Sequence, residues 1–314
     1  RQMCIRDRFR HSNFQKYRGN GNRDRRFPFF GPNFTGWFRT VNMNDEKKIN
    51  TLRPLQGAGR KLFVETYGCQ MNVGDTEIVV AIMQQEGYVY TDKIEEADVV
   101  LINTCSIRDN AEQRIWGRLR EMAHLRRRRP GVLVGIIGCM AERLRERLLE
   151  GENPVDIVAG PDAYRDLPRL VREAGEGGRG VNVLLSREET YAEIAPVRLD
   201  RNGVSGYIAI MRGCNNYCSY CVVPYTRGVE RSRDPQTILN EARSLFENGY
   251  REVTLLGQNV NSYRYGAVDF PELMRLVAEI SPLLRVRFAT SYPKDMSDRL
   301  LLSLIHISEP TRLR

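Results

Sequence analysis

Two continuous apolar runs constrain the fold of this chain more than any other feature. They are "DVVLINT" at 98–104 and "VLVGIIG" at 132–138. Neither run alternates apolar with polar residues, which is typical of strands covered on both faces in a parallel sheet. A helical stretch at about 109–128 lies between them. This alternation of strand and helix predicts an α/β fold with a parallel sheet.

Further elements are expected on both sides of this pair. They are strands at 61–68 and 156–160, and helices at about 74–86, 140–150 and 163–173. Together these elements would form one parallel α/β domain over 61–173.

A second series of strands and helices follows a glycine-rich segment. Residues 174–205 contain "EGGRG" and "DRNGVSG" around one short apolar run, and we expect a linker there. The elements expected beyond it are strands at 207–213, 252–257 and 285–290 and helices at about 235–248, 270–280 and from 295. Three such units begin a (β/α) barrel but do not close it, so 206–302 is predicted to be an incomplete barrel domain.

The net charge of +9 comes from the ends of the chain. Residues 1–42 contribute +8 and residues 303–314 contribute +1, whereas 43–302 contain 36 basic and 36 acidic residues. The overall charge of the two domains therefore gives no argument for binding nucleic acid.

The ends also differ from the domains in character. Residues 1–60 lack regular apolar periodicity, and Met43 has the character of a natural start. We expect 1–60 to be a disordered or non-native leader and 303–314 to be a non-native tail. Cys4 and His306 are then expected to have no functional role.

The composition favours a soluble cytoplasmic protein. The chain contains no apolar run of the roughly 18 residues that a membrane span needs, and no secretory signal. Seven cysteines are an odd number, which fits a reducing compartment better than a disulfide framework.

Three cysteines of the first domain occupy equivalent positions. Cys69, Cys105 and Cys139 each follow a predicted strand. Because the carboxyl ends of parallel strands share one edge of the sheet, the three thiols could converge on a metal site there. The alternative is that each is a small buried core residue.

Three more cysteines lie within eight positions of the second domain. Cys214, Cys218 and Cys221 have the spacing C-x3-C-x2-C. A closed structural zinc site needs four ligands, and no second C-x2-C pair or nearby histidine supplies the fourth. Three thiolates suit an iron–sulfur cluster that keeps one iron open. Structural zinc and a core role remain the alternatives.

This loop, with Tyr220 before its last cysteine, resembles the radical S-adenosylmethionine (radical SAM) superfamily. The resemblance implies a [4Fe-4S] cluster whose open iron binds S-adenosylmethionine. The cluster would cleave this cofactor to a radical that abstracts hydrogen from an unreactive carbon. Gly257, Gln258 and Asn259, with Tyr220, would then contact the cofactor.

Two cysteine triplets in this order resemble the methylthiotransferase family. The motifs that carry this resemblance within 61–302 are "ETYGCQMN", "NTCSIR", "GCMAER", "GCNNYCSYCVVPYTRGVERSR" and "GQNVNSY". The last motif indicates the MiaB type, which modifies tRNA. The resemblance implies that Cys69, Cys105 and Cys139 bind a second [4Fe-4S] cluster, which donates sulfur.

The implied reaction methylthiolates carbon 2 of N6-(dimethylallyl)adenosine at position 37 of tRNA. The implied partners are the tRNA anticodon loop and an electron donor such as flavodoxin or ferredoxin, with the enzyme a monomer. Arg227, Arg231 and Arg233 form a local basic patch that could contact RNA phosphate, or could be a solvated loop.

Two other functions remain open. One is a methylthiotransferase acting on threonylcarbamoyl-adenosine tRNA or on a ribosomal protein. The other is a non-catalytic, metal-stabilised RNA-binding module. The chain also departs from the family: the rest of the barrel and the small TRAM domain are not seen, and Tyr292 stands where relatives often have histidine.

Overall fold

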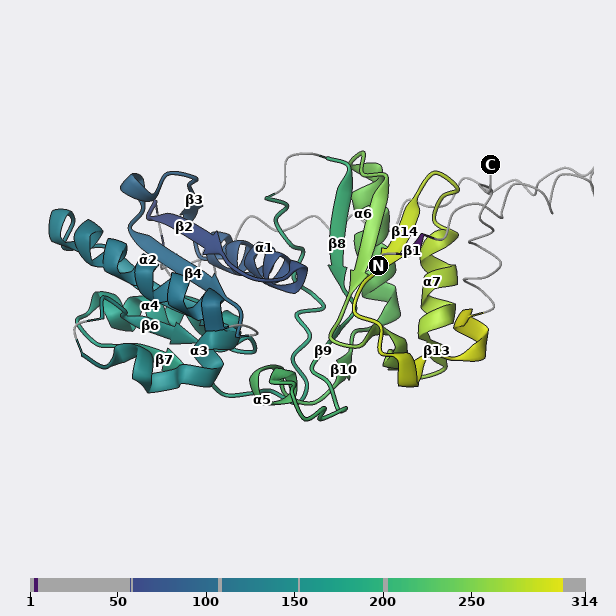
Figure 1. Cartoon of the computed structure of the whole chain (residues 1–314). Helices are drawn as coiled ribbons and strands as arrows, with labels where there is room; N and C mark the ends of the chain where they lie inside the picture. The colour runs from purple at the N-terminus through teal and green to yellow at the C-terminus, as the bar shows by residue number, and fades with distance from the viewer. Residues whose placement is uncertain are drawn as a thin grey trace, which may run out of the picture.

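The computed structural model describes residues 3–4, 57, 59–106, 109–151, 153–199 and 203–301. These residues form two α/β units side by side, coloured blue to teal and green to yellow in Figure 1. The expected leader and tail, with Met43 and His306, lie outside the described residues. The exceptions near the start are Gly57, Gly59 and Arg60, and the backbone of Met3–Cys4, which forms β1.

The first unit is built on a six-stranded, all-parallel sheet of order β3-β2-β4-β5-β6-β7. Its strands are β2 (Lys61–Thr66), β3 (Val89–Tyr90), β4 (Val99–Thr104), β5 (Leu133–Gly138), β6 (Ile157–Ala159) and β7 (Gly180–Asn182). Every residue of β4 and β5 is buried, as their apolar runs predict. Strand β7 lies within the segment predicted as a linker, so the first sheet extends past residue 173.

Helices cover both faces of this sheet. They are α1 (Gln70–Gln85) and α4 (Leu167–Gly175) on one face, and α2 (Asp109–Arg128), α3 (Cys139–Leu144) and the 3₁₀ helix η2 (Arg145–Leu149) on the other. Strand β4 shows why its sequence does not alternate. Val99 and Leu101 join the core under α1, while Val100 and Ile102 join the core under α2.

The second unit contains three parallel strands, β8 (Ser205–Ala209), β11 (Glu252–Leu256) and β14 (Arg285–Phe288), with β1 antiparallel at the edge. Helices α6 (Pro235–Glu247) and α7 (Phe270–Ala278) pack on this sheet over a shared apolar core. These elements confirm the predicted α/β class of both units. In place of the helix expected from 295, the 3₁₀ helix η5 (Pro293–Asp295) comes first, followed by helical residues 298–301.

Short elements connect the longer ones. They are β9 (Met211–Arg212), β10 (Arg231–Ser232), β12 (Arg264–Tyr265), β13 (Val268–Asp269), α5 (Val223–Arg227) and the 3₁₀ helices η1 (Ile94–Glu96), η3 (Tyr164–Asp166) and η4 (Val260–Ser262). The single strand predicted at 207–213 is divided, because β8 joins the sheet whereas β9 pairs with β10. Helix α5 lies between the two units at the bottom of Figure 1.

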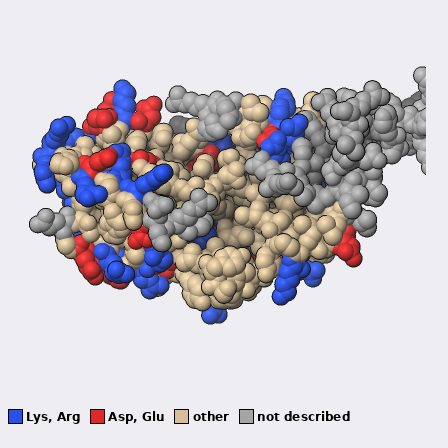
Figure 2. Space-filling model, viewed as in Figure 1, with Lys and Arg blue, Asp and Glu red and all other residues tan. Residues whose placement is uncertain are grey.

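The surface carries charges of both signs. Figure 2 shows basic and acidic side chains interspersed over the first unit and a largely uncharged face below the centre. No helix of the described ranges is both long enough and apolar enough to cross a membrane.

Candidate functional site

The first cysteine triplet lies at one edge of the first sheet. Cys69 is the N-cap of α1 after β2, Cys105 directly follows β4, and Cys139 begins α3 directly after β5. Strands β2, β4 and β5 are neighbours in the sheet. The three cysteines therefore occupy adjacent carboxyl ends, the positions that the strand-end argument predicts.

These three thiols interact with one another. A hydrogen bond with Cys105 is the largest influence on the Cys69 thiol, and it lowers the pKa of Cys69 to about 6 although burial acts in the opposite direction. Burial raises the pKa of Cys139, and the charge of Cys69 acts in the same direction. A lowered cysteine pKa provides the thiolate that metals bind at neutral pH.

A buried amide network fixes the start of α1. Asn72 donates from Nδ2 to Oδ1 of Asn103 over 3.0 Å, and Asn103 donates in return to the backbone oxygen of Asn72 over 2.9 Å. The Cys69 thiol contacts Oδ1 of Asn72 at 3.3 Å. Because Asn103 belongs to β4 and Asn72 to α1, this network holds the Cys69 turn against the neighbouring strand.

The second triplet lies in the loop between β9 and α5. Cys214 is buried, and Cys218 and Cys221 are half-buried. Cys214 donates its backbone N–H to the oxygen of Gly228 over 3.1 Å, and Cys221 donates to the oxygen of Cys218 over 2.9 Å. Burial raises the pKa of Cys214, and the neighbouring charges of Cys221 and Cys218 act in the same direction. The thiols of Cys218 and Cys221 therefore lie near enough to Cys214 for their charges to act on it.

The end of β11 meets this loop. Asn259 donates from Nδ2 to Oδ2 of Asp295 over 2.5 Å, and Asn216 of the cysteine loop donates to the same oxygen over 3.3 Å. A Cβ at Gly257 would lie 2.5 Å from Cγ of Met211, three residues before Cys214. The predicted cofactor residues Gly257 and Asn259 thus lie beside the cysteine loop.

Other residues at this site differ in exposure. Asn259 Oδ1 and Gln258 Oε1 are buried and have no hydrogen-bond partner among the described residues. Tyr220 is 87% exposed. The pKa of Tyr292 is raised by a hydrogen bond with Cys218 and by that thiol's charge, which places Tyr292 against the second triplet.

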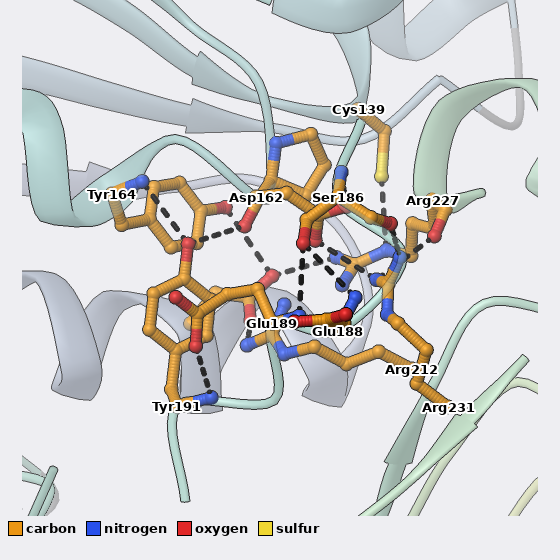
Figure 3. A network of polar contacts seen from close by, with 12 residues as sticks. Cys139, Asp162, Tyr164, Ser186, Glu188, Glu189, Tyr191, Arg212, Arg227 and Arg231 are labelled. Atoms are coloured by element: carbon orange, nitrogen blue, oxygen red, sulfur yellow. Dashed lines mark hydrogen bonds and ion pairs between the residues drawn. The ribbon is translucent and has the colours of Figure 1, made fainter. Parts of the chain in front are cut away.

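A buried ion cluster joins the two cysteine regions. Asp75 of α1 accepts from Nη2 of Arg212 over 2.5 Å and from Nη2 of Arg227 over 2.7 Å. Arg227 of α5 also donates from Nε to Sγ of Cys139 over 3.2 Å, as Figure 3 shows. Arg212 precedes Cys214 by two residues, so both sides of the second cysteine loop are fixed to the first domain.

The predicted RNA-binding role of three arginines needs correction. Arg227, Arg231 and Arg233 are each at most 6% exposed. Arg231 pairs with Asp162 at 2.9 Å and Arg233 with Glu241 at 2.5 Å. Their guanidinium groups neutralise buried carboxylates and do not form a surface patch for phosphate.

Several residues of this region were missed from the sequence. Asp75, Glu142 and Arg212 are buried within or beside the ion cluster, and the side chain of Asp162 is only 1% exposed. The available signal was weak: Asp75 directly precedes the helical run "TEIVVAIM", and Arg212 directly ends the strand-like run "YIAIMR". Charged residues inside apolar runs indicate buried pairing, but the sequence does not show the partner.

The donor sets fit two iron–sulfur clusters. Each triplet supplies three free thiols, the first from three neighbouring strand ends and the second from one loop, and no three His, Cys, Asp or Glu side chains among the described residues form a group that could hold a single metal ion. A four-iron cluster binds each thiolate through a different iron, so its ligands stand farther apart than those of one ion.

Two family models match the chain. Residues 61–160 match the uncharacterized protein family UPF0004, and residues 208–308 match the radical SAM superfamily. The first match covers the sheet edge with Cys69, Cys105 and Cys139. The second contains the loop with the other three cysteines of the site.

Curated relatives cover most of the described chain. A tRNA-2-methylthio-N(6)-dimethylallyladenosine synthase of Amoebophilus asiaticus (strain 5a2) is 55% identical over 260 residues, covering 78% of this chain and 54% of the relative. The synthase of Azobacteroides pseudotrichonymphae genomovar. CFP2 is 55% identical over 259 residues, covering 82% and 57%. The chain thus spans little more than half the length of these relatives.

Solved structures support the fold. A radical S-adenosylmethionine methyltransferase, TsrM, from Kitasatospora setae, with tryptophan substrate and a SAM analog bound, matches with a TM-score of 0.55 at 14% identity. The match covers 79% of this chain and 58% of TsrM. At this identity the likeness concerns the fold alone.

Proposed function

Because residues 208–308 belong to the radical SAM superfamily and the chain is a homologue of the tRNA-2-methylthio-N(6)-dimethylallyladenosine synthases, we propose a radical SAM methylthiotransferase activity. One observation carries this proposal. Each domain contributes one cysteine triplet, and Arg227, which follows the second triplet in the chain, donates across the domain interface to Cys139 of the first. A sulfur-insertion enzyme with two clusters needs that arrangement.

Each domain contributes a distinct set of ligands. Cys214, Cys218 and Cys221 would hold the cluster that binds S-adenosylmethionine, and Cys69, Cys105 and Cys139 would hold the second. When bound, the cluster on Cys214, Cys218 and Cys221 supplies the electron that generates the hydrogen-abstracting radical, and the cluster on Cys69, Cys105 and Cys139 supplies sulfur.

The surrounding residues would position the cofactor. Gly257 brings the end of β11 close to the cysteine loop, because the site leaves no room for a side chain beside Met211. Gln258 and Asn259 offer buried oxygens that can accept hydrogen bonds from an amino group. Tyr220 offers an exposed ring for stacking on an adenine.

The proposed substrate is N6-(dimethylallyl)adenosine in the anticodon loop of tRNA, in line with the names of the relatives. Carbon 2 of the base bears an unactivated hydrogen, so a radical is required to replace it with a methylthio group. We further propose that the enzyme is a monomer in the cytoplasm. Flavodoxin or ferredoxin would supply its electrons.

Iron and acid-labile sulfide content tests the two-cluster arrangement. We expect about eight irons per chain after anaerobic reconstitution, falling to about four in the Cys214/Cys218/Cys221 triple alanine variant. About four irons falling to none would make Cys69, Cys105 and Cys139 core residues and would remove the sulfur-donating half of the proposal. If the reconstituted chain contains neither iron nor sulfide, the remaining function is that of a metal-stabilised RNA-binding module.

Single substitutions separate the two roles. Cys218→Ala is expected to abolish both deoxyadenosine formation and methylthiolation, whereas Cys105→Ala should retain deoxyadenosine formation and lose methylthiolation. Equal loss of deoxyadenosine in both variants, with the second triplet still loaded, would contradict the division. Modified-nucleoside analysis of a deletion strain distinguishes dimethylallyladenosine from threonylcarbamoyl-adenosine and from a protein substrate.

A further inference from the structure

The buried ion cluster at the domain interface carries an excess of positive charge. Two guanidinium groups, those of Arg212 and Arg227, share the single carboxylate of Asp75. All three side chains are at most 4% exposed. Tyr164, which donates to Asp75 over 3.3 Å, is neutral. One positive charge is therefore left without a carboxylate inside the interface.

Two neighbouring carboxylates have arginine partners of their own, and Glu142 contacts Arg145 through one of its oxygens alone. Asp162 binds Arg231 at 2.9 Å, and Glu189 binds Arg165 at 2.5 Å. An uncompensated buried cation is costly, because the protein interior solvates it poorly. The excess charge therefore indicates that an anion belongs at this place.

Arg227 shows where that anion lies. Its Nε donates to Sγ of Cys139 over 3.2 Å, its Nη2 binds Asp75, and its Nη1 has no partner among the described residues. Figure 3 shows the contact between this guanidinium and the sulfur of Cys139 as a dashed line. The side of Arg227 that Asp75 does not neutralise therefore faces the first cysteine triplet.

We propose that Arg227 is a positioning residue of the first cluster: it donates across the domain interface to the Cys139 thiolate and sets the reduction potential of the cluster that this thiolate holds. Asp75 and Arg212 keep the guanidinium in place. This inference rests on the proposed function, because it requires a cluster on Cys69, Cys105 and Cys139.

The direction of the effect follows from charge. One-electron reduction of a cluster adds one negative charge and transfers no atom. A cationic hydrogen-bond donor on a ligating sulfur stabilises the reduced state more than the oxidised state. Removing it is expected to move the potential to more negative values.

The experiment isolates the first cluster by placing every variant in the Cys214/Cys218/Cys221 triple alanine background. The reconstituted proteins are titrated anaerobically with dithionite as the electron source, and the reduced cluster is followed by electron paramagnetic resonance. Arg227→Gln removes the cation, and Arg227→Lys retains the charge without the bidentate geometry. The matched control is Arg231→Gln, since the Arg231 guanidinium also forms a buried ion pair with an aspartate of the first domain but contacts no cysteine among the described residues.

We expect Arg227→Gln to shift the midpoint to more negative potential, Arg227→Lys to shift it less, and Arg231→Gln to leave it unchanged. Equal midpoints for Arg227→Gln and its parent, at equal iron content, would overturn the inference while leaving the proposed function intact. Absence of iron from the parent would instead reject the cluster itself. If Arg227→Gln does not fold, a midpoint in Arg227→Lys equal to that of the parent overturns the inference.

Discussion

At the scale of single residues, Glu142 is a buried acid that is only partly compensated. It lies on α3, three residues after Cys139, and its side chain is fully buried. Arg145 contacts Oε1 at 3.1 Å, whereas Oε2 has no hydrogen-bond partner among the described residues. Burial is the main cause that raises the pKa of Glu142 to about 7.

This pKa predicts a pH-dependent stability. An acid whose pKa is raised on folding binds a proton more tightly in the folded state, so its contribution is complete below the unfolded pKa of about 4.5 and is lost as pH rises to about 7. Glu142→Gln should remove this dependence and raise the free energy of unfolding at pH 8 by about 1–3 kcal/mol. Urea unfolding of the parent and of Glu142→Gln at pH 5 and pH 8 measures these free energies. If the free energy of unfolding changes between the two pH values by the same amount in both proteins, the raised pKa of Glu142 is contradicted.

The sequence predicts the cysteines of the site better than their surroundings. Cys69, Cys105 and Cys139 could be placed together because strand ends in a parallel sheet share an edge, which depends only on the order of elements. The pairing of Asp75 with Arg227 spans 152 residues and two domains, so no local pattern reveals it. For this reason the sequence suggests that Arg227 contacts RNA phosphate, whereas in the structure it pairs with a buried carboxylate.

At the scale of elements, the turn from β5 into α3 depends on one glycine. Gly138 has φ of +89°, and a Cβ there would lie 2.5 Å from Oδ1 of Asn103 and 2.7 Å from the backbone oxygen of Thr104. A similar turn precedes the second triplet, where Gly213 has φ of +76° and a Cβ would lie 1.9 Å from the backbone oxygen of Val229. In each case only glycine lets the chain turn and direct the next cysteine into the site.

Gly138→Ala is therefore expected to destabilise the apo protein by about 2–4 kcal/mol, through the unfavourable φ and the clash with backbone. It should also reduce iron loading of the first triplet while retaining that of the second. Gly131→Ala is the control, since Gly131 has no neighbour within 4 Å of a Cβ. Chemical denaturation and iron content measure the two effects, and equal stability of both variants would refute the role of the turn.

Long elements were easier to predict than short ones. Strands β4 and β5 are apolar throughout because helices cover both faces of their sheet, and such runs are recognisable. By contrast, β9 and β10 are two residues each and exist through pairing with one another. The three-residue β7 joins the first sheet only because β6 offers an open edge, and this depends on tertiary packing.

At the scale of the whole molecule, the two units are joined by ion pairs more than by a shared apolar core. The core of the second unit is separate from the two cores of the first. The ion pairs across the interface include Asp75 with Arg212 and Arg227, and Asp162 with Arg231, while Arg198 of the connecting segment pairs with Glu77 of the first unit and Glu241 of the second. Buried ion pairs have strict geometry, so they fix how the two cysteine triplets face each other.

Asp75→Asn tests this role of the interface. It leaves two buried guanidinium groups without their carboxylate, so we expect the free energy of unfolding of the apo protein in urea to fall by about 3–5 kcal/mol. Glu279→Gln is the control, because Glu279 forms an exposed pair with Arg275, and its loss should cost less than about 1 kcal/mol. The segment 183–199 between the units should also become more sensitive to limited proteolysis in Asp75→Asn alone. Equal stability of the two variants would mean that the domains are held together by other contacts, and the spacing of the triplets would then not depend on Asp75.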